Sequence, residues 1–91
     1  MKTVHKYVLH PTIKHVAMPT GARILCVREQ GQDICIWVHI DLAETRKEVR
    51  TFAVYGTGHV IPDDVNLTYV GTAILQGGSR VLHVFEQDQP A

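Results

Sequence analysis

Residues 24–40 read ILCVREQGQDICIWVHI and decide the fold, because two apolar runs flank a short polar turn that contains Gly31. Runs rich in Val, Ile and aromatic residues, separated by a few turn-forming residues, are typical of a β-hairpin. A two-residue loop at Gln30 and Gly31 would align the apolar residues of the two strands on shared faces. The predicted facing pairs are Val27 with Ile34, Leu25 with Ile36, Cys26 with Cys35 and Ile24 with Trp37.

Both faces of this predicted hairpin carry large apolar side chains, with Val27 and Ile36 on one face and Ile24 and Trp37 on the other. One face must therefore be covered by something outside the hairpin. In so short a chain the cover is either the second sheet of a sandwich or another subunit, and the residues alone leave both open.

Segments of similar composition recur along the chain at intervals of about eight to twelve residues, with turn residues between them. This punctuation predicts an all-β fold, a small antiparallel β-sandwich or barrel of about six to seven strands. The prediction allows at most one short helical turn, and segment 41–48, DLAETRKE, is the one place that could hold it. The predicted strands are 3–9, 14–18, 23–29, 33–41, 47–55, 67–75 and 80–86.

A second hairpin is predicted in residues 73–86, AILQGGSRVLHVFE, where Gly77 and Gly78 supply the positive φ angles that tight turns demand. His83 then lies in an apolar stripe, and we expect it to be a structural histidine that is hydrogen-bonded to Thr72. The predicted facing pairs are Ile74 with Val81, Thr72 with His83 and Val70 with Phe85.

The chain has 91 residues and a formal net charge of zero, with nine basic and nine acidic side chains. This length predicts a single domain over residues 1–91, with room for one modest core but not for a deep cavity as well. Zero net charge argues against a general nucleic-acid binder and leaves self-association without charge repulsion, so a homo-oligomer is expected. No signal peptide or apolar run of about 20 residues is present, which predicts a cytoplasmic, non-membrane protein with reduced cysteines.

Residues 54–64, VYGTGHVIPDD, allow two interpretations. The first is an ordinary strand ending, with Gly56 and Gly58 chosen for their backbone angles and the acidic pair Asp63 and Asp64 in a solvated turn. The second is an anion-binding nest, in which the bare glycine amides act together with Thr57 and His59. The segment lacks the third glycine of a dinucleotide loop and the lysine of a P-loop, so it is not a complete phosphate-binding motif.

Six histidines and two cysteines invite a test for metal binding, which their spacing does not support. Cys35 and His39 are four positions apart on one strand, a separation of about 13 Å that is too large for one zinc ion. We therefore predict no metal and no cofactor, although ligands brought together across strands stay open. Cys26 and Cys35 lie in apolar strand surroundings that are typical of inert thiols.

Taken together, MPTGARIL (18–25), CIWVHID (35–41), VYGTGHVIP (54–62), YVGTAIL (69–75) and LHVFE (82–86) resemble a family of short, mostly phage-encoded proteins of unknown function. The resemblance covers nearly the whole chain, and its most specific elements are the Gly-Thr-Gly-His motif at 56–59 and the His-Val-Phe-Glu strand at 83–86. Leu82 departs from the family pattern, which has Trp there. The resemblance implies a phage accessory protein that acts in the bacterial cytosol against a host component.

The first hypothesis is a non-enzymatic protein that counters bacterial defence by sequestering a nucleotide-type immune signal, at a site shared between subunits. Gly56, Thr57, Gly58 and His59 would hold phosphate, Trp37 or Tyr55 would stack on a base, and Arg50 would offset charge. The alternative is an inhibitor that binds a host defence protein through a strand edge or the face around Trp37. The third hypothesis is a small hydrolase that uses His59 with Asp63 or Asp64.

Overall fold

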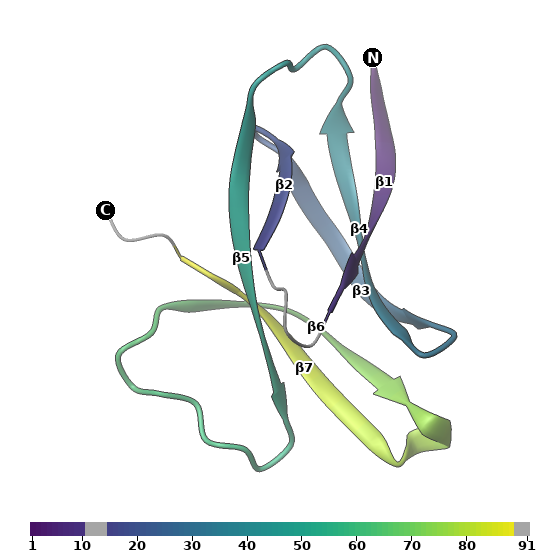
Figure 1. Cartoon of the computed structure of the whole chain (residues 1–91), viewed down its shortest axis with the longest axis vertical. Coiled ribbons are helices and arrows are strands. Elements are labelled where there is room, and N and C mark those ends of the chain that lie inside the picture. The colour runs from purple at the N-terminus through teal and green to yellow at the C-terminus, as the bar shows by residue number, and fades with distance from the viewer. Residues whose placement is uncertain (11–14, 89–91) are drawn as a thin grey trace.

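The computed structural model describes residues 1–10 and 15–88 and contains two antiparallel sheets (Figure 1). Sheet A has the strand order β1-β4-β3, and sheet B has the order β2-β5-β7-β6. No backbone ladder joins the two sheets in this part of the chain, so the fold is a sandwich rather than a closed barrel. The strands are β1 (Lys2–Leu9), β2 (His15–Pro19), β3 (Arg23–Gln30), β4 (Asp33–Asp41), β5 (Lys47–Gly56), β6 (Leu67–Leu75) and β7 (Arg80–Gln87).

The all-β prediction is confirmed, and each predicted strand is present within one residue at its described ends. Residue 14, where the second predicted strand begins, lies outside the described residues. The short helical turn does not form in 41–48. Asp41 accepts hydrogen bonds there from the backbone amides of Ala43 and Glu44, so the chain makes a tight turn and enters β5 at Lys47. Helix in the described part of the chain is limited to the three-residue turn η1 (Gln76–Gly78), which is far too short to cross a membrane.

Strand alternation places the core between the two sheets. In β4 the even-numbered residues from Ile34 to Ile40 point inward and are buried, whereas Cys35, Trp37 and His39 belong to the opposite face. Side chains of this kind fill the space between packed sheets and exclude water from it, which is the main stabilising contribution in such a domain. The largest fully buried apolar residues are Phe52, Met18, Ile36, Val27, Val38 and Val84.

The register predicted for the first hairpin is wrong by two residues. Gln30 pairs with Asp33, so the two-residue loop is Gly31-Gln32 rather than Gln30-Gly31. Gly31 has a φ of 61°, and a glycine at the first central position is what a type II′ hairpin turn requires. A bulge at Leu25 then shifts the pairing once more. The observed facing pairs are Val27 with Ile36, Cys26 with Trp37, Arg28 with Cys35 and Ile24 with Val38.

The second hairpin follows the prediction near its turn and departs from it further along. Gly77 and Gly78 both have positive φ, and Ile74 faces Val81 as expected. A bulge at Val70 changes the next part of the ladder, so that Tyr69 rather than Val70 faces Phe85. The expected pairing of Val70 with Phe85 is therefore wrong, because the extra residue in β6 rotates Val70 toward the core side.

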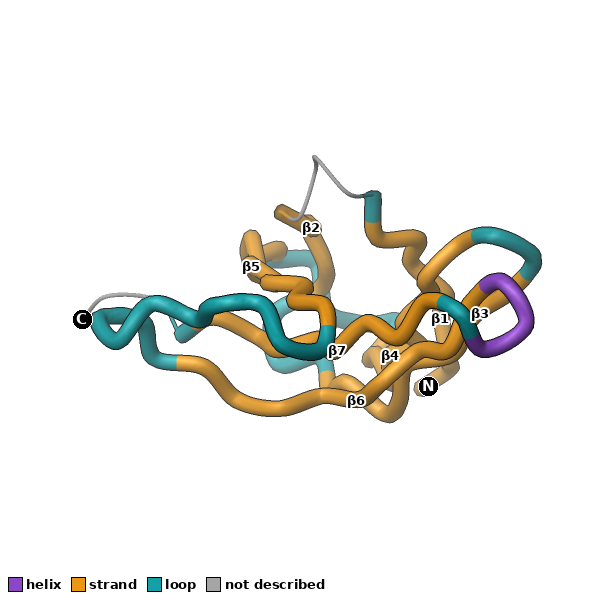
Figure 2. The backbone as a smooth tube through the Cα atoms, turned by 90° about the horizontal axis from the view of Figure 1, so that it is seen from below, coloured by secondary structure: helices purple, strands orange, loops and turns teal. Residues whose placement is uncertain are grey.

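Strands β3 and β6 approach each other closely at Gly71. A Cβ atom on Gly71 would lie 3.1 Å from Val27 Cβ, which is closer than ordinary packing allows. Glycine therefore allows β6 of sheet B to pass closely over β3 of sheet A. The long connection from β5 to β6 projects from sheet B in the direction away from β1, β3 and β4 (Figures 1 and 2).

Candidate functional site

The Gly-Thr-Gly-His segment forms a turn that holds an imidazole against its own backbone. The amide of His59 donates to the carbonyl of Gly56 at 3.0 Å, and Gly58 has a φ of 85°, as the third residue of a type II turn requires. The His59 ring folds back over Gly56, where a Cβ atom would lie only 2.7 Å from its Cε1. Gly56 therefore makes room for the imidazole, and the turn fixes the direction in which His59 points.

The Thr57 hydroxyl begins a hydrogen-bonded chain that links the turn after β5 to β7 and β6. Thr57 Oγ1 lies 2.8 Å from Nε2 of His83, and Nδ1 of His83 lies 3.0 Å from Oγ1 of Thr72. Tyr69 completes the chain, with its hydroxyl 2.6 Å from Thr72 Oγ1. The predicted His83–Thr72 hydrogen bond is confirmed, and the Thr57 hydroxyl is engaged with the His83 ring.

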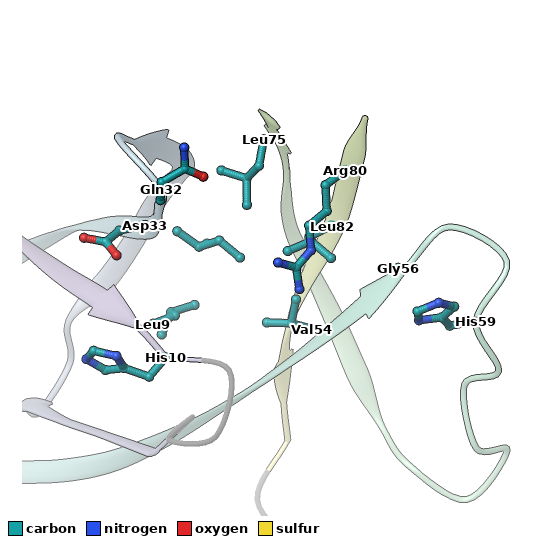
Figure 3. A pocket seen from close by; sticks show the side chains of 11 residues that line it. Leu9, His10, Gln32, Asp33, Val54, Gly56, His59, Leu75, Arg80 and Leu82 are labelled. Carbon is teal, nitrogen blue, oxygen red and sulfur yellow. The ribbon is translucent and has the colours of Figure 1, made fainter. Parts of the chain in front are cut away.

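A cavity of about 230 Å³ lies between the two sheets at the end where this turn sits (Figure 3). Sheet A contributes the end of β1 and the start of β4, and sheet B contributes the ends of β5 and β6 and the start of β7. The floor is apolar and the rim is polar, an arrangement common in small-molecule sites. The apolar lining residues are Leu9, Ile34, Val54, Leu75 and Leu82, and the others are His10, Gln32, Asp33, Gly56, His59 and Arg80.

Arg80 is the permanent cation of this cavity, and its guanidinium points toward the cavity centre (Figure 3). It forms no hydrogen bond or ion pair with any residue that the structure describes. His10 and His59 add two imidazoles to the lining, while Asp33 adds one carboxylate. Among the residues proposed from sequence, Gly56 and His59 line the cavity; Arg80, His10 and Asp33 were missed. Arg80 could have been found, because alternation along β7 places it on the same face as Leu82 and Val84.

A second, more open hollow of about 530 Å³ adjoins the cavity. The two share the lining residues Gly56, His59, Arg80 and Leu82. The second hollow also reaches Thr57 and Ser79. The combined cleft therefore runs from the apolar space between the sheets to the surface beside the Gly-Thr-Gly-His turn.

Arg50 lies on the core side of sheet B, where its donors are engaged. Nη2 donates to Glu86 Oε1 at 2.8 Å, Nε donates to Glu86 Oε2, and Nη1 donates to the carbonyl of Ala22 at 2.7 Å. The hydrogen-bonded Glu86 carboxylate raises the pKa of the Arg50 guanidinium. Arg50 does not line the cleft, and its geometry is that of a structural ion pair.

The two aromatic residues proposed from sequence belong to the outer faces of different sheets. Trp37 lies on sheet A between Lys6 and Cys26, and Tyr55 lies on sheet B opposite His83. The Tyr55 ring makes an edge contact with Phe85, with centroids 6.1 Å apart. Neither ring lines the cleft, so the structure does not bring them together with His59.

The remaining candidates do not assemble into a catalytic or metal centre in the described residues. No group of three His, Cys, Asp or Glu side chains there is close enough to hold a metal ion. His59 has no hydrogen bond to Asp63 or Asp64 within the same residues, and both aspartates are exposed. Cys26 and Cys35 are free thiols, and burial raises the pKa of Cys35 while nearby Lys6 opposes that shift.

The fold and the cleft define a small two-sheet β-protein with a cation-lined cavity at one end of its sandwich. The chain belongs to the family described as "Domain of unknown function (DUF7352)", whose model matches residues 1–91. No curated protein and no solved structure matches the chain.

Proposed function

We propose that the cleft between the sheets binds a small anionic molecule of nucleotide type and that the protein acts by holding it. The observation that carries this proposal is Arg80, a guanidinium without a described partner that points into an apolar cavity. Arg80 is solvent-exposed as a residue, and its guanidinium matches the geometry of phosphate oxygens, so it can bind an anion at the mouth of the cavity. His59, held in place by the turn at Gly56, supplies a second donor at the same rim.

The other lining groups fit the remaining parts of a nucleotide. Leu9, Val54 and Leu82 offer an apolar surface to a planar base. Asp33 and Gln32 can accept hydrogen bonds from sugar hydroxyls or from an exocyclic amine. The inner cavity, at about 230 Å³, is smaller than the roughly 300–1,000 Å³ of typical ligand sites, so the ligand extends into the adjoining hollow.

Sequestration is the activity that this arrangement supports best. The proposal assigns no bond-breaking step to the cleft, and it distributes the ligand contacts over both sheets. In the phage context that the sequence resemblance implies, such a protein lowers the free concentration of a nucleotide signal of bacterial defence. This mode of action is stoichiometric, because each cleft removes one ligand.

The test is thermal unfolding of the wild type against linear and cyclic nucleotides and inorganic phosphate, beside Arg80→Gln. A ligand present at about a hundred times its Kd stabilises the folded state by about 2.7 kcal/mol, which shifts the melting temperature by several degrees. Arg80→Gln should abolish the shift, whereas Arg23→Gln, on the outer face of sheet A, should retain it. The proposal fails if no nucleotide shifts the wild type, or if both variants respond alike.

Protein binding is a second candidate, and the β5–β6 connection favours it. Val60 is 86% exposed and Ile61 is 40% exposed, next to the exposed acidic residues Asp63 and Asp64. Exposed apolar side chains on a projecting loop are common anchors in protein interfaces. A tagged wild-type protein should retain one host protein that Val60→Ser together with Ile61→Ser releases. Retention that is equal in both would exclude this loop as the anchor.

A further inference from the structure

The outer face of sheet B is apolar although nothing in the described chain covers it. Phe52, Val54 and Val84 point into the core, so the residues that alternate with them point outward. We call this surface the aromatic face. It consists of Val49, Thr51, Ala53 and Tyr55 of β5, Leu67, Tyr69, Thr72 and Ile74 of β6, and Val81, His83, Phe85 and Gln87 of β7.

Three aromatic rings form the centre of this face. Phe85 makes edge contacts with Tyr55 and with Tyr69, at centroid distances of 6.1 and 5.6 Å. Around them Tyr69 is 59% exposed, Val49 56% and Ile74 52%. Large apolar side chains that are more than half exposed on one face of a sheet are typical of an interaction surface rather than of a solvated one.

Three polar side chains at the centre of the aromatic face, those of His83, Thr72 and Tyr69, already have partners. Both ring nitrogens of His83 lie within 3.0 Å of threonine hydroxyls, those of Thr57 and Thr72. The Tyr69 hydroxyl is 2.6 Å from Thr72. Burying a polar group is costly chiefly when it loses its hydrogen bond to water and gains none. Here that cost is largely removed, because these hydrogen bonds persist when water leaves the face.

The two outer faces of the sandwich differ in the number of charged side chains that they carry. The aromatic face contains no Asp, Glu, Lys or Arg, and Lys47 lies at its rim, at the start of β5. The outer face of sheet A, in contrast, carries Lys6, Arg23 and Arg28. The outer face of sheet A also exposes Val4, but a partner there would have to pair these charges, whereas the aromatic face is suited to a neutral, apolar partner surface.

We propose that the aromatic face is the interface of a homodimer, in which two copies stack their sheets B face to face about a two-fold axis. Identical uncharged faces meet without burying a charge, and a chain of zero net charge does not repel its copy. Tyr69, Val49 and Ile74 are each more than half exposed, and they supply most of the apolar area that a second copy would cover. The central strands β5 and β7 then cross their copies at the axis.

The test is the mass of the purified protein in solution, measured by light scattering from low to high micromolar concentration. We expect about twice the chain mass of 10.2 kDa for the wild type. Ile74→Lys and Val49→Lys each place an unpaired charge in the interface and should weaken the dimer by more than about a hundredfold. The matched control is Val4→Lys, which adds the same charge at a 47% exposed position on sheet A and should leave the dimer intact.

Circular dichroism of each variant shows whether a lower mass reflects a folded monomer or an unfolded chain. If Ile74→Lys does not fold, Val49→Lys provides the test of the interface. A wild type that is monomeric at all concentrations overturns the proposal. So does a dimer that survives both interface substitutions, or one that Val4→Lys dissociates. None of the substituted residues lines the cleft, so failure here is distinguishable from failure of the ligand proposal.

Discussion

Arg50 and Glu86 join β5 to β7 on the core side of sheet B through a two-pronged ion pair, and Arg50 also reaches the carbonyl of Ala22 just before β3. One side chain therefore ties the two central strands of sheet B to the turn that leads into sheet A. About a fifth of each side chain is exposed, so water screens the pair only in part.

Removing one partner of this pair should destabilise the protein. Glu86→Gln leaves the guanidinium with only the more exposed Glu48 carboxylate, 3.5 Å from Nη1, as a counter-charge, and we expect a loss of about 1–3 kcal/mol in the free energy of unfolding. Urea denaturation measures it. The control is Glu44→Gln, which breaks the exposed pair with Arg46 and should leave the urea midpoint nearly unchanged. Equal effects of the two substitutions would show that Arg50 and Glu86 have no special structural role.

Gly71→Ala should also destabilise the sandwich, because the new Cβ meets Val27 at 3.1 Å across the two sheets. Overpacking of this kind costs about 1–3 kcal/mol. The test is a double-mutant cycle, in which chemical denaturation gives the free energy of unfolding of the wild type, Gly71→Ala, Val27→Ala and the double variant. The methyl group added at Gly71 should cost less when Val27 is already Ala, and strictly additive effects would contradict the close approach of β3 and β6.

Gly56→Ala separates ligand binding from folding. The three atoms nearest the added Cβ all belong to the His59 ring, which can rotate away, so we expect little change in unfolding temperature. The imidazole then leaves the rim of the cleft, and the nucleotide-induced stabilisation should fall at least as far as in His59→Ala. If Gly56→Ala binds ligand as the wild type does, His59 has no part in the site.

The two thiols should react at different rates. Cys35 is 1% exposed and burial raises the pKa of its thiol, so less of it is thiolate at mildly alkaline pH. Cys26 is partly exposed and should be alkylated first, as peptide mass mapping after brief iodoacetamide treatment would show. Comparable labelling of both thiols in the folded protein would contradict this placement.

The raised pKa of Cys35 also predicts that the free energy of unfolding falls at alkaline pH. The difference in the Cys35 pKa between folded and unfolded chain stabilises the folded state while the pH is below the ordinary thiol pKa. This stabilisation is lost as the pH rises through the raised pKa of the folded state. Urea midpoints of Cys26→Ala, in which Cys35 is the sole thiol, should therefore fall across this range. An unchanged midpoint would show that the Cys35 thiol ionises as easily in the folded chain as in the unfolded one.

Alternation and glycine placement in the sequence were enough to predict the strands, but they did not determine their register. A two-residue slip keeps Val27 on the same face, so the apolar pattern and a positive φ at Gly31 fit either pairing, and only the observed pairing of Gln30 with Asp33 distinguishes them. The bulges at Leu25 and Val70 depend on contacts between strands, and no local residue pattern predicts them. The Gly77-Gly78 hairpin was predicted because the positive φ angles are local.

The candidate site was predicted only in part for the same reason. Gly56 and His59 are close in sequence, and their turn could be anticipated. Arg80 and Asp33 lie on different sheets, and only the packing of the sandwich places them around one cavity. Trp37 and Tyr55 were chosen for their chemistry, and strand parity places them on outward faces of different sheets.

The cavity takes its walls from both sheets, with Leu9 and Ile34 on one side and Val54 and Leu82 on the other. A molecule bound there acts as a clamp, since the sheets cannot separate without first releasing it. Its binding energy therefore adds to the energy needed to open the sandwich, and amide protons in strands far from the ligand should exchange more slowly. Occupancy of one small cleft in this way changes the rigidity of the whole chain.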